Sequence, residues 1–288
     1  MRSSVRQCGF RANLELILIV LIKSFAVETT IAYSREMRMA VLNTCTSGGV
    51  LVAQLNREKA VNPLNRELEQ SIKETCLSAQ DDAAVKAIVF TGGVHRSFCA
   101  GDDLSEASEL KTLADVEEFI DRIIALYVAI LSVAKPTVAG IDGYAIGAGF
   151  EMALCCDWRV GTEATKVIGW ELKHGLACPI AAYMIEKSLG RAAMSDIIYG
   201  CEVMPVDWGT ERKFFNEIAE PEDIVERAVS RAAILGAYPE VAYRRTKESL
   251  NRSFIGGLNE VASVAKESHA EGFLSNSAQA HFARVLKR

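Results

Sequence analysis

The sequence lacks the short motifs that identify most nucleotide-binding, zinc and serine-hydrolase sites. It contains no GxGxxG fingerprint, no GxxxxGKS or GxxxxGKT phosphate loop and no GxSxG elbow, which argues against those classes of site. The four histidines have no HxxxH or HExxH spacing, and the eight cysteines form no CxxC pair. We therefore predict no metal site.

Also missing are a basic block, a long apolar run and a disulfide framework. The net charge of −5 argues against nucleic acid as a partner. The apolar run 16–22 is too short to span a bilayer, so no stable membrane insertion is predicted. Adjacent Cys155 and Cys156, with other cysteines in apolar runs, indicate reduced thiols in an intracellular protein.

The first 39 residues differ from the rest of the chain. Arg2, Arg6 and Arg11 precede any acidic residue, which is typical of a mitochondrial presequence. An unstructured leader explains the same composition equally well, and the location would then be cytoplasmic. We treat residues 1–39 as an N-terminal extension that is either a targeting segment or disordered.

From residue 40 onward the pattern predicts an α/β fold, because short apolar runs alternate with amphipathic segments. Strands are expected at 49–55, 85–91 and 137–141, and helices at 64–80 and 113–133. Tyr127 belongs to the apolar stripe of the second helix and is assigned to the core without a chemical role. Beyond Met204 the pattern is helical, with candidates at 205–213, 221–236, 238–250, 256–272 and 275–287. We divide this part into a core, 40–235, and a helical C-terminal region, 236–288, expected to mediate oligomerisation.

The stretch 135–171 concentrates the candidate chemistry. A glycine-rich turn around Gly147 leads into an apolar helix candidate, 150–156, with one charged residue, Glu151. The free N–H groups at such a helix start suit a developing oxyanion, and a carboxyl group buried among apolar residues has a raised pKa. A second glycine turn lies at Gly101, and a second carboxylate follows at Glu171. The alternatives are an exposed glutamate at a helix N-terminus for Glu151 and a surface glutamate for Glu171.

Four segments, NREKAVNPLN, AIVFTGGVHRSFCAGDDL, KPTVAGIDGYAIGAGFEMALCCD and HFARVLKR, resemble the crotonase (enoyl-CoA hydratase/isomerase) family in content, order and spacing. The resemblance covers about residues 40–288. It implies a spiral of β-β-α units with a C-terminal helical region, assembled as a homotrimer or a dimer of trimers. It also implies an acyl-CoA thioester as substrate, with no cofactor beyond the coenzyme A that the substrate carries.

The resemblance assigns roles to individual residues. It implies that the backbone N–H groups of Asp102 and Ala148 form the oxyanion hole, and that Glu151 and Glu171 are the catalytic acid and base. Further residues are implied to contact the substrate or its coenzyme A part: Lys59, Ala60, Leu64, Ala100, Gly101, Gly147, Trp170 and Lys287. Two neighbours stay outside this set, since Asp103 is expected to cap the next helix and His174 to form a hydrogen bond within its loop.

The activity that the resemblance favours is hydration of a 2-enoyl-CoA or the reverse dehydration. The alternatives are a Δ3,Δ2-enoyl-CoA isomerase, which needs one carboxylate, and a non-catalytic oligomer that binds acyl-CoA. One departure from the hydratase pattern affects the substrate: residues 175–184 are apolar and contain Pro179 where a glycine-rich turn is common. We expect this change to favour a branched, aromatic or functionalised acyl group, with Tyr183 as a candidate partner for the reacting water.

Overall fold

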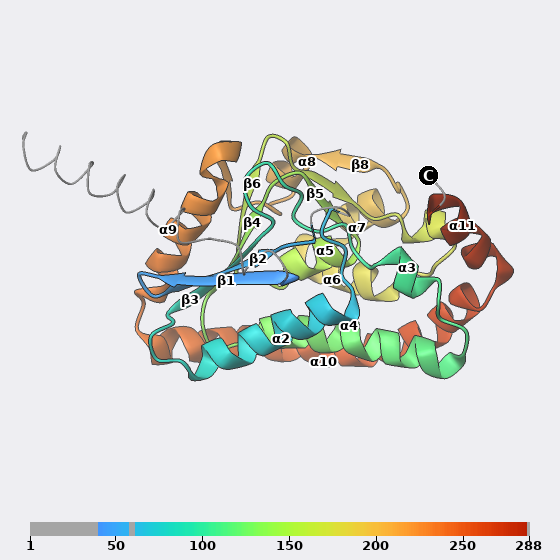
Figure 1. Cartoon of the computed structure of the whole chain (residues 1–288), viewed down its shortest axis with the longest axis horizontal. Helices are drawn as coiled ribbons and strands as arrows, with labels where there is room; N and C mark the ends of the chain where they lie inside the picture. Colours follow the sequence, from blue (N-terminus) through green and yellow to red (C-terminus); the bar gives the residue numbers. More distant parts are fainter. Residues whose placement is uncertain (1–39, 58–60, 287–288) are drawn as a thin grey trace, which may run out of the picture. The chain divides into compact units, whose positions relative to one another are not determined.

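The structure is a computed structural model that describes residues 40–57 and 61–286. The predicted extension, 1–39, lies outside the described residues. Figure 1 shows the described elements coloured along the sequence.

The larger of two sheets has six strands in the order β1-β2-β3-β4-β6-β9. Its strands are β1 (Leu42–Ser47), β2 (Val50–Leu55), β3 (Ala87–Thr91), β4 (Thr137–Ile141), β6 (Trp158–Thr162) and β9 (Glu217–Ala219). Strands β1 and β2 pair antiparallel, and every other pair in this sheet is parallel. The expected strands at 49–55, 85–91 and 137–141 are confirmed within two residues at each end.

A second sheet has three strands in the order β5-β7-β8. Its members are β5 (Tyr144–Ile146), β7 (Lys166–Ile168) and β8 (Val203–Pro205). Along the chain, β4 and β6 belong to the large sheet, whereas β5 and β7, which follow them directly, belong to the small one. The chain therefore passes from one sheet to the other in successive turns, which confirms the predicted spiral of β-β-α units.

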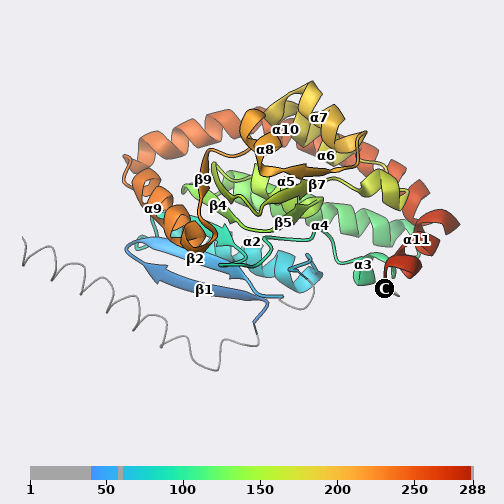
Figure 2. The same ribbon diagram turned by 90° about the horizontal axis from the view of Figure 1, so that it is seen from above.

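Helices cover both faces of the large sheet. On one side, α2 (Arg66–Asp81), α4 (Leu113–Ser132) and α10 (Glu240–Phe273) lie side by side (Figures 1 and 2). On the other side, α9 (Ile224–Gly236) packs on β2, β3, β4 and β6. Alternate strand residues face the two layers, as a pleated strand requires: Ile88 and Phe90 join the core under α2 and α4, whereas Ala87 and Val89 join the core under α9.

The remaining elements are short or lie around the small sheet. They are α3 (Leu104–Ala107), α5 (Ala148–Leu154), η3 (Glu171–His174), α6 (Pro179–Leu189), α7 (Arg191–Ile198), α8 (Val206–Glu211), η4 (Pro221–Asp223) and α11 (Asn276–Leu286).

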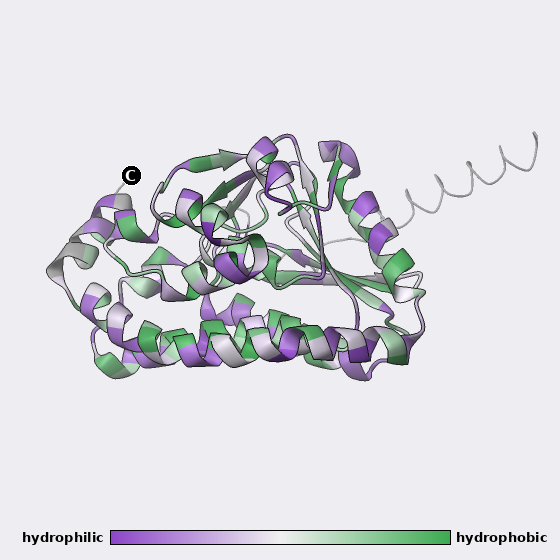
Figure 3. Cartoon of the chain, turned by 180° about the vertical axis from the view of Figure 1, so that it is seen from behind, coloured by the Kyte–Doolittle hydropathy of each residue, from purple (hydrophilic) through white to green (hydrophobic). Residues whose placement is uncertain are grey.

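The prediction of two helices at 238–250 and 256–272 is wrong, because one helix, α10, spans both ranges in 34 residues. The glycine pair Gly256-Gly257 lies inside this helix. A Cβ atom on Gly257 would lie 2.3 Å from the hydroxyl oxygen of Tyr183 on α6. Gly257 therefore permits the close packing of α6 on α10 and does not end the helix. Figure 3 shows hydrophilic and hydrophobic residues mixed along α10, as expected of a helix with one face on α4.

The region after Met204 is also less helical than predicted. Residues Glu217–Ala219 form β9, which pairs with β6 and extends the large sheet. The sequence offered no apolar alternation there, because the strand has only three residues. This region also builds a separate core cluster under α9, centred on Ile224, Ala228 and Ala232, where no second core was expected. Val41 to the C-terminus forms one compact unit, and an oligomerisation role for 236–288 stays a prediction.

One buried ion pair joins α10 to the large sheet. The ammonium group of Lys247 donates to Asp157 Oδ2 at 2.7 Å and to the carbonyl oxygen of Lys135 at 3.1 Å. Its side chain is only 5% exposed. The same Asp157 oxygen accepts from the backbone N–H of Thr137 at the start of β4. Loss of the cation would leave these acceptors buried without their donor.

We expect Lys247→Met to lower the free energy of unfolding by about 3 kcal/mol, the usual cost of removing one member of a buried pair. Lys266→Met is the matched control, because Lys266 lies on the same helix and pairs with Asp121, whose side chain is 62% exposed. That change should cost less than about 1 kcal/mol. Urea denaturation followed by circular dichroism measures both values. Equal losses in the two variants would contradict this account.

Candidate active site

The site forms where two glycine-containing loops touch. Residue Cys99 pairs with β5: its N–H donates to Tyr144 O at 3.1 Å, and its carbonyl oxygen accepts from Ile146 N at 3.0 Å. This pairing brings Gly101 against the turn before α5. A Cβ atom on Gly101, where φ is +82°, would lie 2.7 Å from Ile146 O and 3.5 Å from Ala148 N. Only glycine fits both the backbone angle and the contact.

The predicted oxyanion donors lie on these two loops. Leu64 bonds to the residues on both sides of Asp102, because its N–H donates to Gly101 O at 2.7 Å and its carbonyl oxygen accepts from Asp103 N at 2.8 Å. Successive backbone groups of an extended segment point to opposite sides, so the N–H of Asp102 points away from Leu64. Ala148 is the first residue of α5. Within residues 40–57 and 61–286, neither the Asp102 nor the Ala148 N–H donates to a protein acceptor, and both are free to bind a ligand oxygen.

Glu151 lies on the buried face of α5 and is 6% exposed. The hydroxyl of Tyr127 donates to Glu151 Oε2 at 2.6 Å. This contact corrects the assignment of Tyr127 to the core without a chemical role; the helical period of 113–133 placed it inside but said nothing of its partner. The pKa of Glu151 is raised to about 8, mainly by burial and also by the charges of Glu171 and Asp102, while the Tyr127 hydrogen bond acts in the opposite direction.

Glu171 begins the short helix η3 directly after the small sheet. The N–H of Gly147 donates to Ile168 O at 2.8 Å, which brings the end of β7 beside the turn before α5. A Cβ atom on Gly147 would lie 2.7 Å from Glu171 Oε1, so this carboxyl group adjoins the oxyanion donors. Its Oε2 is buried without a partner in the part of the chain that the structure describes. Burial raises the pKa of Glu171.

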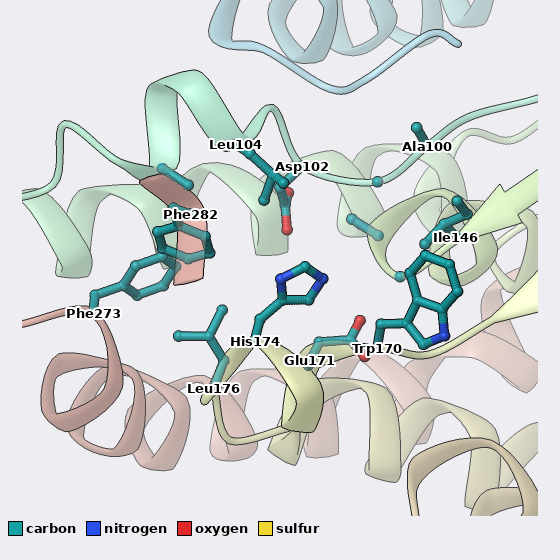
Figure 4. A pocket seen from close by; sticks show the side chains of 14 residues that line it. Ala100, Asp102, Leu104, Ile146, Trp170, Glu171, His174, Leu176, Phe273 and Phe282 are labelled. Atoms are coloured by element: carbon teal, nitrogen blue, oxygen red, sulfur yellow. The ribbon is translucent and has the colours of Figure 1, made fainter. Parts of the chain in front are cut away.

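A cavity of about 210 Å³ collects most of the predicted residues (Figure 4). The predicted residues that line it are Ala100, Gly101, Asp102, Gly147, Ala148, Trp170 and Glu171. A smaller inner cavity is also lined by Asp102, Ala148 and Glu171, and Glu151 reaches it from α5. The two predicted carboxyl groups and the two predicted N–H donors therefore meet in one place.

Four predicted contact residues are not among the described residues that line this cavity. Leu64 is 1% exposed and belongs to the core, so its described contribution is the backbone pairing that holds the Asp102 loop. Lys59, Ala60 and Lys287 lie outside the described residues. Sequence patterns could not separate Leu64 from a lining residue, because both kinds of position are apolar.

The apolar segment after Glu171 forms part of the wall, as expected. Ala177, Cys178, Ile180 and Ala181 line the inner cavity, and Pro179 is the first residue of α6. Tyr183, however, is not available to a reacting water: its hydroxyl donates to the carbonyl oxygen of Phe254 on α10 at 2.9 Å. That expectation is wrong, because one further turn of α6 carries Tyr183 away from the cavity.

Two polar residues of the site were not assigned a role from sequence. At Asp102 only the backbone N–H was given a role, yet the side-chain Oδ1 is buried without a partner within the described residues. Burial raises the pKa of Asp102 to about 8, with smaller effects from Glu69 and Glu171. The hydrogen bond expected of His174 within its loop is wrong, because its Nδ1 is buried without a partner within the described residues and its ring lines the cavity. Burial lowers its pKa to about 4, with a further effect from His281. By contrast, Asp103 caps α3 as predicted, accepting from Ser105 N at 2.9 Å.

The arrangement suits proton transfer next to a stabilised oxyanion. Two free N–H groups can hold a carbonyl oxygen as it gains negative charge. Two carboxyl groups share the site, and the charge of Glu171 is one cause of the raised pKa of Glu151, so their repulsion favours a state with one ionised and one neutral group. One base and one acid then face the same bound molecule.

No group of three or more His, Cys, Asp or Glu in the described residues could hold a metal ion, and no described helix is long and apolar enough to cross a membrane.

Comparison with known proteins finds relatives over most of the chain. The model of the family described as enoyl-CoA hydratase/isomerase matches residues 45–283. Carboxymethylproline synthase of Pectobacterium carotovorum subsp. carotovorum is 37% identical over 83% of this chain and 96% of that protein. Crotonyl-CoA hydratase of Syntrophomonas wolfei subsp. wolfei is 25% identical over 75% of this chain and 84% of that protein. Among solved structures, ThnE from S. clavuligerus has a TM-score of 0.70 and 28% identity, covering 79% of this chain and 100% of that one.

The raised pKa of Glu151 predicts how stability depends on pH. The folded chain holds this proton up to about pH 8, whereas an ordinary glutamate releases it near pH 4.5. The folded state therefore binds more protons in this interval, and the free energy of unfolding falls as the pH rises through it. We expect Glu151→Gln to flatten this fall between about pH 5.5 and pH 8, since glutamine stays neutral and still accepts from Tyr127.

Urea denaturation at several pH values measures the slope. Glu109→Gln is the matched control, because this side chain is 79% exposed, and it should leave the slope unchanged. Equal slopes in the wild type and Glu151→Gln would show that the folded state does not hold this proton.

Proposed function

The chain belongs to the enoyl-CoA hydratase/isomerase family, known as the crotonase family, and we propose that it is an acyl-CoA enzyme that works through a thioester enolate. The observation that carries this proposal is the meeting of two free backbone N–H groups with two buried carboxyl groups at one cavity. The N–H groups of Asp102 and Ala148 would bind the thioester oxygen and stabilise it when it becomes an enolate oxygen. Glu171 and Glu151 would move the protons.

The reaction we place first is the addition of water to a 2-enoyl-CoA, or its reverse. Glu171 takes a proton from water while the water oxygen bonds to Cβ, and the electron pair of the double bond moves onto the thioester oxygen. Glu151 then gives its proton to Cα, and the thioester carbonyl is restored. At the end of the step Glu171 carries a proton and Glu151 has lost one. Proton exchange with the solvent then restores the starting state of both groups. This division needs one ionised and one neutral carboxyl group, as their mutual repulsion favours.

A second candidate is formation of a carbon–carbon bond by the same enolate. The observation that favours it is the 37% identity to a carboxymethylproline synthase over nearly the whole of that protein. A carboxymethyl group is what an acetyl thioester leaves once its α-carbon has formed a bond and the thioester has been hydrolysed. The apolar wall of Ala177, Ile180 and Ala181 beside Glu151 suits an organic reactant as well as it suits water. Isomerisation of a Δ3-enoyl-CoA would need only one of the two carboxyl groups.

A homotrimer, or a dimer of trimers, is part of the proposal. Helix α10 carries large apolar side chains that are exposed in the single chain, with Val241 63%, Leu250 70% and Val264 57% exposed. Contact with other copies would remove such side chains from water, which stabilises an assembly. The helical C-terminal region, 236–288, would then supply part of the contact between subunits.

We expect Glu151→Gln and Glu171→Gln each to lower kcat by at least about a hundredfold, because each removes a proton-transferring group. Glutamine has nearly the same size and keeps the hydrogen-bond acceptor, so acyl-CoA binding should persist. Steady-state kinetics and calorimetric binding measure the two effects. Glu163→Gln, an exposed glutamate in the turn after β6, is the control and should keep full activity. Unchanged turnover in both cavity variants would exclude the acid–base roles, and binding without any wild-type turnover would favour the non-catalytic alternative.

A substrate panel distinguishes the two reactions. We expect kcat/KM for a branched, aromatic or hydroxyl-bearing 2-enoyl-CoA to exceed that for crotonyl-CoA by at least about tenfold, because side chains replace a glycine-rich wall. Loss of the enoyl absorbance measures hydration. Exchange of the acetyl-CoA methyl protons with deuterated water, dependent on Glu171 and without hydration of any enoyl-CoA, would instead identify the carbon–carbon reaction. Crotonyl-CoA turnover near the diffusion limit would contradict the expected preference.

A further inference from the structure

The outer part of the cavity is apolar except for two polar side chains. Figure 4 shows the carboxyl group of Asp102 and the imidazole ring of His174 directed toward each other from opposite walls. Asp102 comes from the loop before α3, and His174 ends η3. The side chains around them are hydrophobic: Leu104, Ala107, Leu176, Phe273 and Phe282. Such a surrounding makes any unsatisfied polar atom costly.

Each of the two residues has a buried polar atom without a partner. Within the part of the chain that the structure describes, Asp102 Oδ1 and His174 Nδ1 take part in no hydrogen bond. Buried polar atoms in folded proteins are almost always paired. Glu171 Oε2 is a third unpaired atom in this cavity, but its expected partner is the reacting centre. The proposed reaction uses neither Asp102 Oδ1 nor His174 Nδ1, so it gives these two atoms no partner.

The nearest arginine side chains form their ion pairs with other residues, and neither one bonds to Asp102 or His174 within the described residues, although Arg122 Nε is itself unpaired there. Arg122 binds Glu69 at 2.7 Å, and Arg57 binds Asp103 at 2.8 Å. His281 meets His174 with its ring edge, with 4.5 Å between ring centroids. Among the described residues that line the cavity there is no lysine or arginine. The described lining therefore offers these two atoms no cationic partner, and a polar group of the bound molecule can fill that role.

Building on the proposed function, we propose that the acyl group of the substrate carries a hydroxyl or amine group that Asp102 and His174 bind together. These two side chains are then specificity-determining residues, distinct from the backbone N–H of Asp102 that holds the thioester oxygen. A plain alkyl chain would leave both polar atoms buried and unpaired, and sites built around a polar group reject analogues that lack it. A carboxylate on the acyl group would face Asp102 and Glu171 with no cation in reach.

The test measures binding in the Glu171→Gln background, so that the probes are bound without turnover. The probes are (E)-2-enoyl-CoA thioesters of two chain lengths whose terminal group is methyl, hydroxymethyl, aminomethyl or carboxylate. The double bond prevents the terminal group from cyclising onto the thioester. At one of the two lengths, the hydroxymethyl or aminomethyl probe should bind at least about tenfold more tightly than the methyl probe. The carboxylate probe should bind no more tightly than the methyl probe.

Asp102→Ala and His174→Phe should each abolish the preference for the polar probe. Phenylalanine keeps the ring that packs on His281, and alanine keeps the backbone N–H. Glu109→Gln is the control, because this nearby carboxyl group is 79% exposed and lies outside the cavity; it should keep the full preference. Asp102→Asn, which retains a polar side chain of the same size, should keep part of it and serves if alanine prevents folding.

Three results would overturn the proposal: tighter or equal binding of the methyl probe at both lengths, a preference for the carboxylate, or a polar preference that survives both cavity variants. The hydroxyl or amine group could instead belong to a second substrate. Measuring acetyl-CoA binding with and without ethanolamine tests this alternative. Tightening of acetyl-CoA binding by ethanolamine, without any preference for a tethered polar group, would assign the donor to a second substrate and overturn the assignment to the acyl group. Failure to bind any of the thioesters would instead count against the proposed function.

Discussion

The site depends on one close approach between two stretches of backbone. The segment 99–101 pairs with β5 and brings Gly101 to the turn before α5, where no side chain could fit. This contact places the N–H groups of Asp102 and Ala148 at one cavity, although the two residues belong to different loops. The first loop follows β3 of the large sheet and the second follows β5 of the small sheet, so the two sheets together hold the loops in place. Hydrogen bonds between main chains make this geometry rigid, and a rigid pair of donors stabilises charge without reorganising.

Around that contact the fold buries three carboxyl groups, Asp102, Glu151 and Glu171, in a mostly apolar cavity. Burial raises the pKa of each one, and repulsion by neighbouring carboxylates adds to this for Asp102 and Glu151; the raised pKa values destabilise the folded chain at neutral pH. The cost is offset elsewhere, by the two cores on either side of the sheet and by paired charges such as Lys247 with Asp157. The same burial that lowers stability prepares these groups to exchange protons near neutrality.

The parts of the site predicted from sequence were those fixed by position along the chain. Glu151 follows the glycine turn by a set number of residues, and Glu171 follows the next strand, so a resemblance in spacing located both. Tyr127 could not be found in this way, because its contact with Glu151 depends on how α4 and α5 pack, and an apolar stripe says only which face is buried. The unbroken helix α10 was missed for a related reason: Asn251, in the gap between the two predicted helices, donates to the carbonyl oxygen of Leu131 on α4, and such a contact between helices is not visible in the sequence. Strand β9 was missed because three residues carry too little pattern to show a strand.

The pairing of Leu64 with the Asp102 loop directs the backbone N–H of Asp102 to the cavity whatever its side chain is. Binding of the thioester oxygen and recognition of the acyl group can therefore be carried out by different parts of the same residue. The thioester oxygen would be held by main-chain groups, which every residue except proline possesses, while the side chain at the same position is free to differ. Substrate range can therefore evolve at position 102 by single substitutions without loss of the shared chemical step. An enzyme built in this way is a favourable starting point for engineering, because a library of side chains at that position samples new acyl groups on a constant reaction centre.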